Sequence, residues 1–215
     1  MFERVGGSMI AALLFLSLAA CGPERAREAA VNGPMRSAVA QMAATTGHLA
    51  TGAVTFTEVE GGIRVVAAFV GVRQGAHGFH IHEKGDCSSG DGTSAGDHWN
   101  PEGVAHGGRH AGIRHVGDLG NVTADADGVV RADFVDGIIP FDGVNSIIGK
   151  GFILHADEDD LTSQPSGAAG IRISCGVIES TNEKTKPAIV PPTSARVVRL
   201  VVNWFTELRE RMGSN

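Results

Sequence analysis

The 215-residue sequence predicts an all-β domain, a sandwich or barrel of seven or eight short strands. Two runs, residues 63–70 and 130–135, alternate with a period of two, as strands with one buried face do. The 30 glycines fall largely between short apolar runs, which is typical of a turn-rich β protein. The length suits one domain with tails. The net charge of -6 argues against a nucleic-acid partner.

The N-terminus has the pattern of an export signal. Residues 10–20 are apolar, too few to cross a bilayer, and end directly before Cys21. We therefore predict a signal peptide of the lipoprotein type at 1–20, with a lipid on Cys21. An ordinary signal peptide followed by an unrelated cysteine is the alternative. Residues 21–47 are expected to form a tether, and the protein to be lipid-anchored in the bacterial cell envelope, facing the periplasm.

Residues 48–180 carry the strand pattern and are predicted to be the folded domain. A glycine turn at 60–62 links the first two expected strands. The strands expected from the apolar runs lie near 50–59, 63–70, 77–83, 119–124, 130–135, 147–155 and 171–178.

Two long loops interrupt this pattern. The alternation disappears between residues 83 and 117, where the chain is polar and rich in glycine. A second loop, 156–170, begins with an acidic run. Irregular loops of this length in a compact β domain indicate a function or an internal cross-link.

The tail, residues 181–215, begins with a proline-containing linker. Apolar residues then recur at helical spacing between Val197 and Met212, which predicts an amphipathic helix. Packing on its own domain, on a second subunit or on a membrane surface are the open alternatives.

Seven side chains in the domain have the character of metal ligands. His80 and His82 are two apart on an expected strand and point to one face, while Ile81 points into the core. His155 ends another strand and can supply a third nitrogen for copper or zinc. Three further histidines and one carboxylate, at loop spacings, fit a closed tetrahedral zinc site. This second set is His98, His106, His115 and Asp118.

The chain has three cysteines. With Cys21 assigned to lipid, Cys87 and Cys175 remain, and in an oxidising compartment they predict one disulfide. Two buried free thiols are the alternative.

Several runs of this sequence together resemble the copper/zinc superoxide dismutase family. They are Gly-Phe-His-Ile-His at 78–82, Thr-Ser-Ala-Gly-Asp-His-Trp-Asn-Pro at 93–101, His-Gly-Gly at 106–108, Arg-His-Val-Gly-Asp-Leu-Gly-Asn-Val at 114–122, Ile-Ile-Gly-Lys at 147–150 and Arg-Ile-Ser-Cys-Gly-Val-Ile at 172–178. The resemblance covers about residues 48–180. It implies a Greek-key β-sandwich or barrel of about eight antiparallel strands with long metal-binding loops.

The resemblance also implies roles for individual residues. Copper falls to His80, His82, His98 and His155. Zinc falls to His98, His106, His115 and Asp118, so that His98 is shared. The disulfide joins Cys87 to Cys175. Arg172 is implied to guide and dock the anion, and Asp159 to link a copper-ligand histidine to a zinc-ligand one.

The family reaction converts superoxide to dioxygen and hydrogen peroxide, with Arg172 and His98 as the catalytic residues. A homodimer is an open expectation. The alternative function is a membrane-tethered copper- and zinc-binding homologue without turnover. This sequence departs from the family pattern at Trp99, at Ser166, and in the short loop 156–170, which has no lysine for steering the anion.

Overall fold

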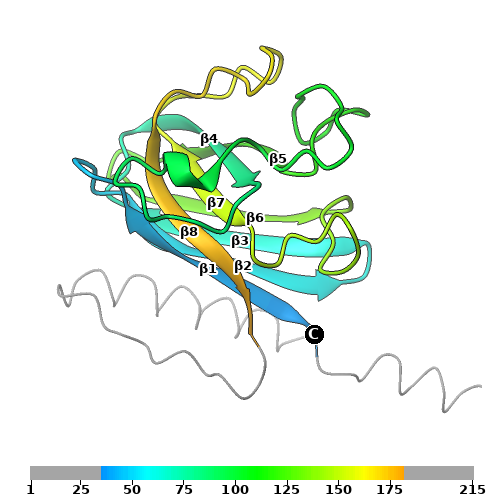
Figure 1. Ribbon diagram of the computed structural model, residues 1–215. Helices are drawn as coiled ribbons and strands as arrows, with labels where there is room; N and C mark the ends of the chain where they lie inside the picture. The colour runs from blue at the N-terminus through cyan, green and yellow to red at the C-terminus, as the bar shows by residue number, and fades with distance from the viewer. Residues whose placement is uncertain (1–34, 182–215) are drawn as a thin grey trace, which may run out of the picture. The chain divides into compact units, whose positions relative to one another are not determined.

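The computed structural model describes residues 35–181, and these residues form one antiparallel β-barrel (Figure 1). The predicted signal peptide, Cys21 and the predicted helical tail lie outside the described residues. Within residues 35–181, no helix has the length and hydropathy that a membrane crossing requires.

Eight strands and one short 3-10 helix make up the described part of the chain. They are β1 (Ser37–Ala44), β2 (Thr51–Val59), β3 (Gly62–Val70), β4 (Gly75–His82), η1 (Thr93–Ala95), β5 (Asp118–Ala124), β6 (Val130–Asp136), β7 (Gly151–His155) and β8 (Arg172–Ser180). The order around the closed barrel is β1-β2-β3-β6-β5-β4-β7-β8. The chain connections from β3 to β4 and from β6 to β7 each cross two other strands of this order, as Greek-key connections do. The predicted all-β fold is confirmed.

The first strand corrects the predicted domain boundary. β1 lies inside the range 21–47 that the sequence assigned to a tether. Its sequence, Ser-Ala-Val-Ala-Gln-Met-Ala-Ala, consists largely of good helix formers, so its local preference does not indicate a strand. Pairing with β2 on one side and β8 on the other overrides that preference. The strand buries Ala38, Ala40 and Met42 in the core.

Phenylalanine rings at alternate strand positions fill the barrel. Phe79 of β4 lies 4.5 Å from Phe152 of β7 between ring centroids, and Phe56 of β2 lies 5.7 Å from Phe152. Ile81, two residues after Phe79, is fully buried in the same core. Because side chains alternate along a strand, Phe79 and Ile81 of β4 fill the barrel, and His80 and His82 face the loops.

The seam between β5 and β6 is the weakest part of the ladder. Within the described residues these strands pair only at Ala124 and Val130, beside the turn that joins them. Arg114 spans the far end of the seam. Its guanidinium donates to the carbonyl oxygen of Asp118 at 2.8 Å and to both carboxylate oxygens of Asp136 at 2.8 and 2.6 Å. A buried ion pair thus takes the place of missing backbone pairing.

Two long connections, residues 83–117 and 156–171, lie on the same side of the barrel as β4 and β5 (Figure 1). The first is held by the main chain of Ile81, which accepts from Trp99 N–H and donates to the carbonyl of Gly117, at 2.8 and 2.9 Å. A Cβ at Gly117 would lie 2.2 Å from the Ile81 oxygen, so this approach requires glycine. These bonds bring His98 and His115 over β4.

Candidate metal centre

The first group of candidate ligands contains four buried histidines. His80 and His82 come from β4, His155 ends β7, and His98 comes from the long loop, where it forms an isolated bridge with His82. One nitrogen from each of the four rings lies within 4.8 Å of the others. All four residues are at most 6% exposed.

The second group combines His98, His106, His115 and Asp118. One ligand atom from each residue again lies within 4.8 Å of the others. Asp118 begins β5 and is fully buried, and its carboxylate also accepts the main-chain N–H groups of Gly107 and His115 at 3.1 and 2.9 Å. These bonds fix the carboxylate and the loop around it.

His98 belongs to both groups through different ring nitrogens. Nδ1 lies 2.8 Å from Asp118 Oδ1, in the second group. Nε2 is buried and has no hydrogen-bond partner among the described residues. The two nitrogens of one imidazole therefore face two separate ligand sets.

The other five rings each donate one N–H and leave the second nitrogen for a metal. His82 Nδ1 donates to Gly96, His155 Nδ1 to Gly170 and His115 Nε2 to Val104, all at main-chain oxygens 2.8 to 3.1 Å away. Asp159 accepts from His80 Nε2 at 2.7 Å and from His106 Nε2 at 3.0 Å. Such bonds fix the tautomer of a metal-binding histidine.

The buried nitrogens that these bonds leave over fit metal ions. Nδ1 of His80, His106 and His115 and Nε2 of His98 are inaccessible and lack a hydrogen-bond partner in the described part of the chain. Burying such atoms unpaired is costly, and a coordinated cation removes the cost. The first group consists only of imidazoles, which are suitable ligands for copper. The second group adds a carboxylate, and three imidazoles with one carboxylate suit zinc.

Asp159 connects the two groups by a second route. Burial by itself would raise the pKa of its carboxyl, but the bonds from His106 and His80 lower it below the usual range. Burial lowers the pKa of His106, and the neighbouring carboxylates of Asp118 and Asp159 outweigh this and raise it to about 9. A Cβ at Gly167 would lie 1.8 Å from the Asp159 carboxylate, so this position is restricted to glycine.

An open cavity of ≈ 430 Å³ leads to the first group. His82, His98, His155 and Arg172 line it, and Arg172 is the only lysine or arginine among the described residues in its wall. Burial lowers the pKa of the Arg172 guanidinium, and Asp97 and Asp91 act in the opposite direction. An arginine stays protonated in proteins, so it places a fixed positive charge in a wall that also holds the acidic residues Glu83 and Asp97.

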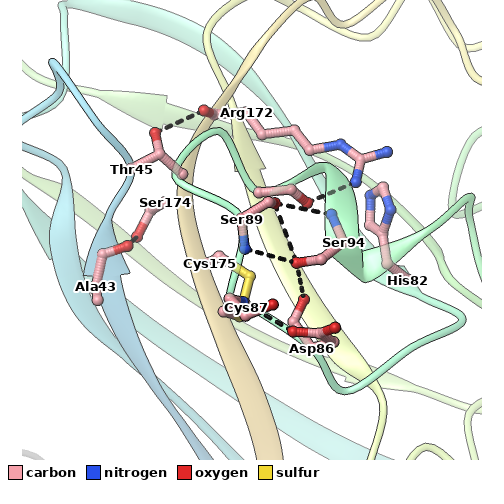
Figure 2. Close-up of a disulfide and its surroundings, with 12 residues drawn as sticks. Ala43, Thr45, His82, Asp86, Cys87, Ser89, Ser94, Arg172, Ser174 and Cys175 are labelled. Carbon is pink, nitrogen blue, oxygen red and sulfur yellow. Dashed lines mark hydrogen bonds between the residues drawn. A yellow bond between two sulfur atoms is a disulfide. The ribbon is translucent and has the colours of Figure 1, made fainter.

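The long loop is tied to the barrel by a disulfide between Cys87 and Cys175 (Figure 2). The bond joins the loop to β8 across 88 residues of sequence. Ser94 Oγ donates to the carbonyl of Asp86 at 2.9 Å, which closes the loop segment on itself. The Arg172 guanidinium donates to two carbonyl oxygens of the same loop, those of Gly92 and Gly96, at 2.7 and 2.6 Å.

We expect that reducing this disulfide weakens metal retention. The loop carries His98, and without the cross-link its ordered state costs more entropy, by about 2–4 kcal/mol for a typical disulfide. The measurement is copper and zinc content after dialysis against a chelator, with and without prior reduction. A Cys87→Ser/Cys175→Ser double variant controls for metal removed by the reductant. Equal retention in oxidised and reduced protein would contradict the expectation.

The structure brings together all seven predicted ligands, with Asp159 and Arg172 around them. Ser166 lies in the cavity wall, and Lys150 Nζ lies 3.5 Å from the centre of the Trp99 ring. Sequence reasoning missed Arg114 and the glycine carbonyls that hold Arg172. Main-chain acceptors leave no side-chain signal. Arg114 begins the run 114–122, but nothing in that run shows which acidic residue it pairs with.

Comparisons with known proteins agree with this geometry. The family model for copper/zinc superoxide dismutase (SODC) matches residues 50–178. A copper–zinc superoxide dismutase of Schizosaccharomyces pombe is 49% identical over 137 residues, 60% of this chain and 88% of that protein. An extracellular copper–zinc superoxide dismutase of Drosophila melanogaster is 45% identical over 135 residues, 59% of this chain and 74% of that protein.

A solved structure agrees as well. The crystal structure of the clock protein EA4 matches with a TM-score of 0.61 and 41% identity, over 66% of this chain and 93% of that one. The family match covers more than half of the sequence, and the fold and both ligand groups lie within or beside it. The chain belongs to the copper/zinc superoxide dismutase family.

Proposed function

We propose that this protein converts superoxide to dioxygen and hydrogen peroxide. The observation that carries the proposal is the pair of buried ligand groups sharing His98, beside a cavity whose wall holds one fixed positive charge. The balanced reaction takes two superoxide anions and two protons to one dioxygen and one hydrogen peroxide. It needs a site that attracts a small anion, exchanges one electron at a time and supplies protons.

The two ligand groups divide between two ions. His80, His82, His98 and His155 would hold copper, and His98, His106, His115 and Asp118 would hold zinc. Copper supplies the alternating one-electron oxidation and reduction of superoxide, and zinc keeps its valence. The donor types support this division, because a carboxylate is present only in the second group.

Arg172 attracts and docks the anion. Its guanidinium carries the only lysine or arginine charge among the described residues of the cavity wall, beside His82 and His155. The chain's net charge of -6 acts over longer distances and is screened beyond about 8 Å at physiological salt. Arg172 therefore acts on an anion in the cavity more strongly than distant charges do, although Glu83 and Asp97 also lie in the cavity wall.

His98 carries a proton for the second half of the reaction. Its Nδ1 lies beside Asp118 in the second group, and its Nε2 faces the first group, next to the cavity. Nε2 can take up a proton and deliver it to the reduced anion, and water in the open cavity can supply the second proton. Asp159 keeps the neighbouring rings of His80 and His106 in one orientation through both halves of the reaction.

Metal loading tests the function. Metal-free protein is loaded with copper, with zinc or with both, and superoxide decay is followed. We expect catalysis only in the copper-containing forms. A His155→Gln variant should lose copper and activity, while His110→Gln, at an exposed histidine outside both groups, should keep them. A fully loaded protein that leaves superoxide at its spontaneous decay rate would favour the binding homologue without turnover.

We further propose export and anchoring by a lipid on Cys21, with residues 21–36 as the remaining tether. The apolar run before Cys21 supports the proposal, and a relative carries the description extracellular. Membrane fractionation of the full chain and of a Cys21→Ser variant tests it.

The homodimer stays a prediction, and sedimentation of the holoprotein tests it.

A further inference from the structure

The position of the Arg172 side chain depends on a loop that its own strand reaches through the Cys87–Cys175 disulfide. Both guanidinium acceptors, the carbonyl oxygens of Gly92 and Gly96, flank η1 in the disulfide loop. The main chain of Arg172 begins β8 on the barrel. Docking an anion at a fixed point therefore requires that loop and strand keep one relative position.

The ladder alone does not fix the main chain of Arg172. On one side, β8 pairs with β7 through a register shift between Leu154 and His155, and the shifted pair is His155 with Arg172. On the other side, the pairing of β8 with β1 ends at Ala44 and Ser174, before Arg172 is reached. The residue lies at an irregular end of the strand.

Thr45, the residue after β1, is hydrogen-bonded to Arg172 (Figure 2) and lies beside Gly92 of the loop. Its hydroxyl donates to the carbonyl oxygen of Arg172 at 2.7 Å, and its N–H donates to the carbonyl of Ile173 at 3.2 Å. Its methyl group lies on the loop side, where a Cβ at Gly92 would be 3.4 Å from it and 3.3 Å from the Arg172 Cβ. Thr45 is 7% exposed, so water does not replace its bond.

We propose that Thr45 is a positioning residue for Arg172, acting on the anion through the arginine. The hydroxyl holds the irregular start of β8 beside Gly92 of the loop. The guanidinium then reaches both carbonyls and presents its charge to the cavity at one place. The inference rests on the proposed function only in taking Arg172 as the docking group.

Ser174 offers a matched control on the same pair of strands. Its buried hydroxyl donates to the carbonyl oxygen of Ala43 at 3.1 Å, also joining β8 to β1 (Figure 2). Removing it deletes one hydrogen bond between these strands, as removing the Thr45 hydroxyl does. The bond lies beyond Arg172 along the strand and involves neither the loop nor the arginine.

The test uses the copper- and zinc-loaded protein and azide, a small monoanion whose binding to copper(II) is followed by absorption. We expect Thr45→Val to raise the azide Kd about three- to tenfold, the effect of losing one hydrogen bond. Thr45→Ser, which keeps the hydroxyl, should restore the Kd to within about twofold. Ser174→Ala should lower Tm like Thr45→Val but leave the Kd unchanged.

An unchanged azide Kd in Thr45→Val, or an equal rise in Ser174→Ala, would overturn the proposal. Thr45→Ala, which removes the hydroxyl without adding bulk, decides the question if Thr45→Val does not fold. Azide binding requires no turnover. A wild-type protein that binds azide but does not consume superoxide would therefore contradict the proposed function and leave the role of Thr45 measurable.

Discussion

We expect that replacing Arg172 with glutamine lowers the dismutation rate at least about tenfold and leaves the copper and zinc content unchanged. Glutamine removes the charge but keeps a donor near the carbonyls of Gly92 and Gly96. Arg172 is not one of the candidate ligands in either group, so the substitution removes no ligand atom. Rates at several ionic strengths, with metal analysis of the same samples, measure the effect.

Two further substitutions control this experiment. Arg172→Lys keeps the charge but loses the fork that bonds both carbonyls, and should retain more of the rate than glutamine does. Arg131→Gln removes an exposed arginine of β6 that pairs with Asp125, and should leave the rate unchanged. An Arg172→Gln protein as fast as wild type at physiological salt would remove this residue from the mechanism.

The second large effect is expected at Asp136, where asparagine should cost about 3–5 kcal/mol of unfolding free energy. The substitution leaves the Arg114 guanidinium, 1% exposed in its side chain, without its counter-charge. The same guanidinium donates to the main chain at His115 and Asp118, two zinc-site residues. The unfolding free energy measured in urea should fall, and the protein should retain less zinc in the presence of a chelator.

Asp133→Asn is the matched control on the same strand. Asp133 pairs with Arg64 at 2.6 Å, but the two side chains are 34% and 26% exposed. Solvent screens such pairs, so the expected cost is about 0–1 kcal/mol. If Asp136→Asn and Asp133→Asn proved equally mild, the buried pair would not be what holds the end of the seam.

The sequence predicts those parts of the fold that depend on strongly patterned strands. Residues 51–59 and 62–70 alternate clearly and are joined by a glycine turn, and the structure has β2 and β3 there. Residues 37–44 lack such a pattern, because their alanines satisfy a helix as well as a buried strand. Their state is decided by pairing with β2 and β8, which no local window contains.

The site likewise has parts that the sequence predicts and parts that depend on the folded chain. His80 and His82 are visible because a strand places them on one face, and His98 because its neighbours match a family motif. The acceptors that orient these rings are mostly main-chain oxygens, such as those of Gly96 and Gly170, and they depend on the path of the loops. Arg114 was missed because its partner, Asp136, is 22 residues away and the pair forms only when the barrel closes.

The open seam between β5 and β6 has a consequence beyond stability. A stretch of strand without a neighbour is an edge, and exposed edges recruit strands from other molecules. In this barrel the pairing stops beside the turn, while Arg114 occupies the far end with its guanidinium bonded to both strands. We expect the buried ion pair to hinder edge-to-edge association as well, because it holds the two strands together where their backbone pairing stops.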